Sequence, residues 1–141
     1  MSFYRYFPQL AHTGCRIVSA CSREYNCIAW AAGEQDRWWW PDANDIGYWP
    51  ADVPREETID AFIRAYQTLG FASCDDATLE PGSEKVAIYA LAGKPIHAAR
   101  QLSNGRWTSK LGNCEDIEHT LDGLTGSTYG SVVQIMRRPR I

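Results

Sequence analysis

The sequence lacks long hydrophobic runs, and this absence excludes a membrane-spanning helix. No apolar segment of the 141-residue chain approaches the ~20 residues that cross a bilayer. The first ten residues, MSFYRYFPQL, have no apolar core of the kind found in secretory signal peptides. We therefore expect a cytoplasmic protein without a membrane partner, and export by a route that needs no signal stays open.

A strong excess of one charge is also missing. The chain has 14 Lys and Arg against 17 Asp and Glu, which gives a net charge of −3. Its one basic cluster, Arg137, Arg138 and Arg140, is short. A balance of this kind gives no general attraction to nucleic acid, so we expect no nucleic-acid partner.

Closely spaced cysteine pairs, which are typical of structural zinc sites, are absent. Among the 5 cysteines, Cys15, Cys21 and Cys27 recur every six residues. Zinc ligands usually lie about two to four residues apart. An odd number of cysteines without a signal peptide favours free thiols in a reducing compartment. We expect no metal and no cofactor.

What the chain does have is the composition of a single globular domain. It is 45% hydrophobic and 22% charged, and it is long enough to bury a core. It contains no internal repeat and no low-complexity tract. We expect one domain over residues 1–141, and the sequence does not give its oligomeric state.

The clearest strand signals lie between residues 84 and 112. Asn104–Gly105 is a typical hairpin turn, because both central residues of a type I′ turn need positive φ. The strands we predict here and elsewhere are Lys85–Leu91, Pro95–Ser103, Arg106–Lys110, the edge strand Phe71–Cys74 and the last strand Tyr129–Arg137.

Helix signals occur in three places. The predicted helices are one within Ser22–Gly33, a longer one from Asp52 to Gly70 and a short one from Cys114 to Leu124. Ile59, Phe62, Ile63 and Tyr66 follow the helical period in the second and should pack on the sheet. This order predicts an α+β fold with an antiparallel sheet of about four to six strands.

Cys27 lies in the first of these helices, at a position that could make its thiol reactive. If Asn26 is the N-cap, the thiol lies in the first turn, where unpaired N–H groups and the helix dipole lower a cysteine pKa. The alternative is a small buried apolar residue.

Residues 34–55 form a long proline-containing loop that holds four of the 6 tryptophans. These are Trp38, Trp39, Trp40 and Trp49. Long loops are often binding segments, and aromatic side chains could line a groove for a ligand. The alternative is that the tryptophans form the core of the loop itself.

The pairing of Cys27 with His97, 70 residues later at the start of a strand, resembles the papain-like NlpC-type cysteine peptidases and amidases. The resemblance covers Tyr25 to Lys110 and includes the spacing from His97 to Ser109. The family's Asp-Cys-Ser-Gly reads Asn-Cys-Ile-Ala here, and Ser109 stands where His, Asn or Gln is usual. The chain also looks like an uncharacterised bacterial family with Asn-Cys-Ile-Ala-Trp and Trp-Thr-Ser-Lys-Leu-Gly segments.

This resemblance implies a papain-like sheet packed by a Cys-bearing helix and a second helix. It also implies a thiol hydrolase or amidase, for bond cleavage or deamidation, in which Cys27 attacks and His97 acts as base. Ser109, or else Thr108 or Gln101, would orient the imidazole. The substrate would be a peptide or amide. Its expected contacts are Trp38, Trp39, Trp40, Trp49, Gln101 and Lys110. The alternative is a non-catalytic immunity or accessory module that binds a protein partner.

The hairpin register decides which side chain can orient His97. A strict two-residue turn places Thr108 and Lys110 on the face of His97, whereas a bulge restores Ser109. We expect Cys27 Sγ within about 4 Å of a His97 nitrogen. We expect His12 and His119 to be bystanders.

Overall fold

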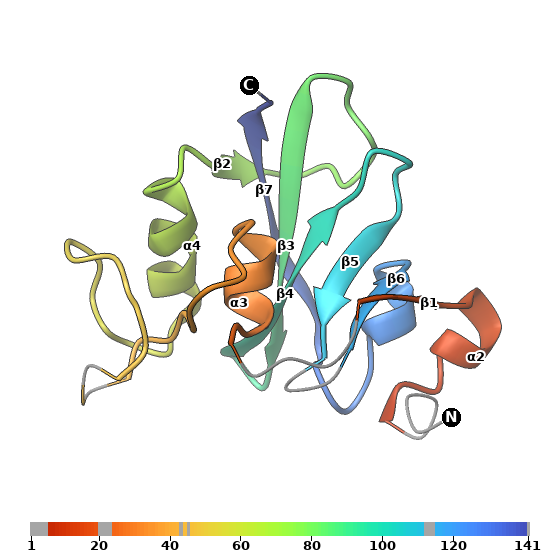
Figure 1. Ribbon diagram of the computed structural model, residues 1–141, viewed down its shortest axis with the longest axis horizontal. Helices are drawn as coiled ribbons and strands as arrows, with labels where there is room; N and C mark the ends of the chain where they lie inside the picture. Colours follow the sequence, from red (N-terminus) through yellow and green to blue (C-terminus); the bar gives the residue numbers. More distant parts are fainter. Residues whose placement is uncertain (1–5, 20–23, 43, 45, 112–114, 141) are drawn as a thin grey trace.

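The main element of the protein is one seven-stranded sheet, in the order β1-β6-β5-β4-β3-β7-β2 (Figure 1). The computed structural model describes residues 6–19, 24–42, 44, 46–111 and 115–140. The strands are β1 (Arg16–Ser19), β2 (Ala72–Cys74), β3 (Ser83–Leu91), β4 (Lys94–Gln101), β5 (Trp107–Lys110), β6 (Asp116–His119) and β7 (Ser131–Pro139). Each pairing between these strands is antiparallel.

The described helices are short. They are α2 (Leu10–Thr13), α3 (Cys27–Ala31), α4 (Ile59–Gln67) and the 3-10 turn η1 (Asp122–Leu124). None of the helices in these residues is long and apolar enough to cross a membrane.

The β3 strand separates two hydrophobic cores. Its side chains alternate, so that Val86 and Ile88 join one core while Ala87 and Tyr89 join the other. A strand buried on both faces reads as a continuous apolar run, which explains the strong signal of Lys85–Leu91 in the sequence.

The first core lies under α3, α4 and the tryptophan-rich loop. In α4, Thr58 caps the helix by accepting from the Ala61 N–H at 3.1 Å. This cap starts α4 later than the predicted Asp52. Phe62 and Tyr66 are fully buried as predicted, whereas Ile59 and Ile63 are only partly buried.

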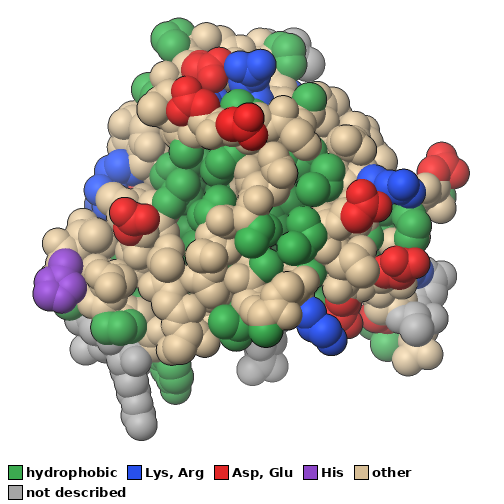
Figure 2. Space-filling view, turned by 180° about the vertical axis from the view of Figure 1, so that it is seen from behind, with side chains coloured by type: hydrophobic (Ala, Val, Ile, Leu, Met, Phe, Trp, Pro, Cys, Tyr) green, Lys and Arg blue, Asp and Glu red, His purple; other side chains and the backbone are tan. Residues whose placement is uncertain are grey.

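The second core lies on the opposite face of the sheet. It is formed by side chains of β3, β4, β5 and β6 together with Leu10 of α2 and Leu124 of η1. Figure 2 shows the molecule from behind, with hydrophobic side chains visible in the middle and charged ones around them.

The papain-like α+β fold that the sequence suggested is wrong. Across the described residues, one seven-stranded antiparallel sheet with few short helices makes this a β-rich fold. Part of the error lies at residues 115–124. We predicted a helix from Cys114 to Leu124, but the alternation Asp-Ile-Glu-His of residues 116–119 forms β6, and the short turn η1 follows it. Cys114, the first residue of that predicted helix, lies outside the described residues.

The predicted strands of the meander are confirmed, with a different turn. Leu102 N–H donates to Arg106 O at 2.7 Å, and Gly105 has a φ of 86°. This three-residue loop adds one residue to the predicted two. Gln101 therefore pairs with Trp107, and Ser109 lies on the face that carries His97. The edge position of β2 and the last strand β7 are also confirmed.

Candidate functional site

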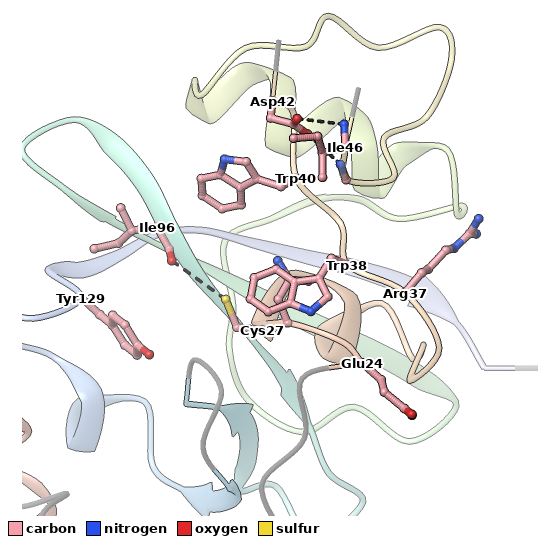
Figure 3. Close-up of a pocket in the computed structure, with 11 residues that line it drawn as sticks. Glu24, Cys27, Arg37, Trp38, Trp40, Asp42, Ile46, Ile96 and Tyr129 are labelled. Carbon is pink, nitrogen blue, oxygen red and sulfur yellow. Dashed lines mark hydrogen bonds between the residues drawn. The ribbon is translucent and has the colours of Figure 1, made fainter. Parts of the chain in front are cut away.

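One cavity among the described residues has a volume of about 860 Å³, which is ample for a small-molecule site. It lies at the start of α3, between the tryptophan-rich loop and the beginning of β4 (Figure 3). Its lining residues are Glu24, Asn26, Cys27, Arg37, Trp38, Trp40, Asp42, Ile46, Gly47, Ile96 and Tyr129.

Asn26 joins the cavity wall to the helix. Its side-chain oxygen accepts from the N–H groups of Ala29 and Trp39, both at 3.1 Å. Its side-chain nitrogen donates to Trp39 O at 2.8 Å. One buried amide thus caps α3 and fixes the backbone of Trp39. The neighbouring Trp38 and Trp40 consequently line the cavity.

Two charged side chains of the cavity wall are occupied by partners within the loop. Arg37 pairs with Glu34 at 2.6 Å and stacks over the Tyr48 ring at 3.5 Å. Asp42 accepts from the N–H groups of Ile46 and Gly47, and these bonds lower the pKa of its carboxyl. The tryptophans, Tyr129 and the isoleucines are therefore the main surface offered to a ligand.

Cys27 is the first residue of α3 and lies in the wall of this cavity. Its Sγ donates to the carbonyl oxygen of Ile96 at 3.9 Å, as Figure 3 shows. Burial raises the pKa of the thiol to about 11, although the Ala98, Ile28 and Cys27 N–H groups act to lower it. The low pKa expected from the sequence is therefore wrong for this structure. Desolvation outweighs the few donors that a five-residue helix supplies.

His97 is fully buried, and Ser109 orients its ring. The Nε2 atom lies 2.9 Å from Ser109 Oγ. The ring stacks on Tyr129 at 4.0 Å between centroids and meets the edge of Tyr89. Its Nδ1 atom is buried without a hydrogen-bond partner. Burial, followed by the charge of His119, holds the pKa of His97 well below its ordinary value.

Cys27 and His97 are adjacent in space but are not hydrogen-bonded to each other. The Cys27 sulfur interacts with the backbone on both sides of His97, through the Ile96 carbonyl and the Ala98 N–H. The partner of Sγ in this structure is the backbone of β4, and Nδ1 of His97 has none. The expected distance of about 4 Å between Sγ and a His97 nitrogen stays a prediction.

We expected His119 to be a bystander within a helix; the helix is wrong, whereas its part in a reaction is not tested by its contacts. It ends β6 with its Nε2 atom 2.7 Å from Ser109 Oγ and its Nδ1 atom 2.6 Å from Thr120 O. Burial lowers its pKa to about 4. The alternation of residues 116–119 was the signal that could have placed His119 beside Ser109.

Four of the residues that we predicted to bind substrate do not line the cavity. Trp39 and Trp49 lie in the core, where their ring N–H groups donate to Glu34 and to the Pro54 carbonyl. Gln101 donates to Ala77 O at 2.8 Å. Lys110 is buried with its Nζ 5.1 Å from the Tyr25 ring.

Tyr129 is the main cavity residue that the sequence did not reveal. It lies just before β7, lines the cavity and carries the His97 ring on its face. Only the stacking across the fold identifies it, because an isolated tyrosine before a strand has no distinctive pattern.

The described cysteines belong to no cluster of possible metal ligands. Cys15, Cys27 and Cys74 are free thiols, whereas Cys21 and Cys114 lie outside the described residues. Within the part of the chain that the structure describes, no three His, Cys, Asp or Glu residues gather in a way that could hold a metal ion.

A known family matches most of the chain. Residues 16–137 match the family described as Domain of unknown function (DUF7689), and the chain belongs to that family. No curated protein and no solved structure matches the chain.

Proposed function

We propose that this protein is a cysteine-dependent amide hydrolase, with Cys27 as the nucleophile and His97 as the general base. The observation that carries this proposal is the state of His97. One ring nitrogen is fixed by Ser109, and the other is buried without a partner in a strand whose backbone contacts the Cys27 thiol. The similarity to NlpC-type peptidases and amidases is then one of chemistry, on a different and β-rich fold.

The reaction begins with transfer of the Cys27 thiol proton to Nδ1 of His97. The thiolate attacks the carbonyl carbon of an amide, and the C–N bond breaks as His97 returns the proton to the leaving amine. Water then hydrolyses the thioester, which releases a carboxylic acid and restores the thiol. The N–H groups of Cys27 and Ile28, which already interact with the sulfur, are the donors available to the oxyanion.

The free protein holds this pair in an inactive arrangement. The thiol is bonded to Ile96 O, and the imidazole is held by Tyr129. Both of these residues line the cavity. A substrate that enters between Trp38, Trp40 and Tyr129 would therefore contact the groups that keep nucleophile and base apart. An apolar or aromatic side chain beside the scissile amide fits these walls, and free thiols suit the reducing cytoplasm as its place of action.

An activated ester tests this proposal without knowledge of the natural substrate. We expect p-nitrophenyl acetate to acylate Cys27, seen as an acetyl adduct on its peptide by mass spectrometry. Cys27→Ser should abolish the thioester, and His97→Ala should slow acylation by about 100-fold or more. Cys74→Ser is the matched control, because Cys74 is a free thiol outside the cavity. Equal acylation of wild type and His97→Ala would refute the proposal.

A second candidate is a non-catalytic site that binds an apolar group of a protein partner. The raised pKa of Cys27 favours it, because a permanently protonated thiol is a packing residue. Trp38 is 40% exposed and Ile46 is 84% exposed at the cavity, as binding surfaces often are.

The dye 1-anilinonaphthalene-8-sulfonate distinguishes the two candidates. A pure binding site predicts dye binding that Trp38→Ala weakens and Cys27→Ser leaves unchanged, with no acylation of Cys27. Thr108→Val is a control outside the cavity, where the Thr108 hydroxyl accepts from Trp30 at 3.1 Å. Unchanged dye binding in Trp38→Ala would exclude this cavity as the site.

A further inference from the structure

We propose that His119 is a positioning residue which, through Ser109, fixes the tautomer of His97 and leaves the lone pair of His97 Nδ1 free to accept a proton. This inference deepens the proposed function and rests on it. It assigns to His119 a task that the Cys27–His97 pair alone does not explain.

The three side chains lie on three adjacent strands. His97 is on β4, Ser109 on β5 and His119 on β6, and all three are fully buried. Ser109 Oγ lies between the two rings, 2.9 Å from Nε2 of His97 and 2.7 Å from Nε2 of His119. The network ends at the carbonyl of Thr120, 2.6 Å from Nδ1 of His119.

The direction of each bond follows from the carbonyl at the end. A carbonyl oxygen only accepts, so Nδ1 of His119 must carry a proton and donate it to Thr120 O. With a pKa of about 4, His119 is neutral near pH 7 and has just this one ring proton. Its Nε2 atom therefore accepts, and the Ser109 hydroxyl must donate to it.

The same reasoning gives the position of the ring proton on His97. Ser109 has one hydroxyl hydrogen, which is used on His119, so its oxygen is left to accept from His97. Nε2 of His97 therefore carries the proton. Because burial keeps His97 neutral, its Nδ1 atom holds a bare lone pair. This is the nitrogen that has no partner in the structure.

Without an acceptor at residue 119, the tautomer would no longer be set. The Ser109 hydroxyl could then turn and donate to Nε2 of His97, which would move the ring proton to Nδ1. A protonated Nδ1 cannot take the proton of Cys27. With His119 in place, proton transfer to Nδ1 gives an imidazolium whose Nε2–H bond to Ser109 is unchanged, so no other bond has to be rearranged.

The test is a two-bond ¹H–¹⁵N correlation spectrum of the full chain with ¹⁵N-labelled histidine, which separates protonated from unprotonated ring nitrogens. We expect His97 to be protonated at Nε2 only and His119 at Nδ1 only. His12 is exposed and serves as the internal reference. Protonation of His97 at Nδ1 in the wild type overturns the proposal.

Two variants separate positioning from packing. His119→Phe keeps a ring but removes the acceptor, and it should shift His97 toward the Nδ1–H tautomer. His119→Gln supplies an amide oxygen as acceptor and should restore Nε2–H. We expect the rate of Cys27 acylation to fall by up to about 100-fold in His119→Phe and to recover in His119→Gln. A His97 tautomer that is unchanged in His119→Phe overturns the proposal.

The spectra do not depend on activity, so the two proposals fail separately. Correct tautomers with an unreactive Cys27 would refute the hydrolase and leave the network intact. A reactive Cys27 beside a His97 that is protonated at Nδ1 would refute the network alone. A thermal scan would show whether His119→Phe folds. If it does not, the His97 tautomer in the wild-type spectrum still tests the proposal.

Discussion

Cys27 is governed by burial more than by its place at the start of a helix. A pKa of about 11, against 9.0 for an ordinary thiol, means that ionisation costs about 3 kcal/mol more than in water. The first-turn N–H groups recover only part of the desolvation cost. A cysteine at a helix start is thus reactive only if its sulfur stays solvated or has a charged partner.

Cys27 should therefore be alkylated slowly at neutral pH. We expect iodoacetamide to modify Cys27 slowly between pH 6 and 8 and progressively faster toward pH 11, because only the thiolate reacts. Peptide mapping by mass spectrometry over a pH series measures this profile. Rapid alkylation near pH 6 would contradict the burial argument.

Single residues also show where sequence reasoning stops. Cys27, His97 and Ser109 could be selected because helix caps and strand starts have local patterns. Trp38 and Trp39 are neighbours of the same type, yet one lines the cavity and the other is in the core. The bonds of Asn26 to Trp39 decide between them, and these bonds cross 13 residues of chain. No local pattern encodes such a contact.

Among the elements, α3 and the tryptophan-rich loop depend on one side chain. Asn26→Ala removes the cap of α3 and leaves the buried N–H and C=O of Trp39 without partners. We expect a loss of about 2–4 kcal/mol in the free energy of unfolding, measured by urea denaturation.

Thr58→Ala is the matched control for this prediction. Thr58 caps α4 through a bond of the same length, 3.1 Å, but it does not hold the loop. It should cost about 1 kcal/mol. Equal losses in the two variants would show that the Trp39 bonds contribute nothing.

The turn before β7 carries a second prediction. Gly126 and Gly130 bond to each other's backbone, and a Cβ at Gly130 would lie 1.9 Å from Ala90 O, at a φ of 73°. Gly130→Ala should therefore displace the neighbouring Tyr129 and lower the free energy of unfolding by about 2 kcal/mol or more. Gly126→Ala is also strained, at a φ of 154°, but its Cβ would meet no atom within 4 Å, so it should cost less. A thermal scan compares the two, and equal melting temperatures would contradict the clash.

The hairpin between β4 and β5 shows how one residue changes an element. The sequence predicted both strands and their turn, because Asn104–Gly105 has a specific conformational preference. It did not distinguish a two-residue from a three-residue loop, since Gly105 suits both. That single residue sets whether Thr108 or Ser109 faces His97.

For the whole molecule, two buried neutral histidines make stability depend on pH. The pKa of His119 is about 4 in the folded state against 6.5 ordinarily, so the unfolded chain binds the proton first as the pH falls. His97 acts in the same direction. Stability is complete above about pH 6.5 and decreases down to about pH 4, by roughly 3 kcal/mol for His119 alone.

Urea denaturation at a series of pH values measures this loss. His119→Gln should reduce the slope between pH 6.5 and 4, because the variant has no histidine to protonate there. Equal slopes for wild type and His119→Gln would contradict the prediction.

At this scale the sequence predicted an antiparallel sheet but not its extent. The central strands have long apolar runs and were found. The strands β1 and β6 have four residues each and pair with each other at one end of the described sheet. Their stability comes from pairing across about 100 residues, which short segments do not reveal. This pairing turned an expected α+β domain into a β-rich one.

The buried, protonated thiol of Cys27 also affects how fast the protein is oxidised during storage. Peroxide and disulfide exchange act on thiolates, and with a pKa of about 11 only about one Cys27 in ten thousand is ionised near pH 7. In air-exposed preparations, Cys27 should therefore keep its reduced form for longer than the more accessible Cys15 and Cys74. The fold would thus protect its own sulfur from oxidation until a ligand opens the site.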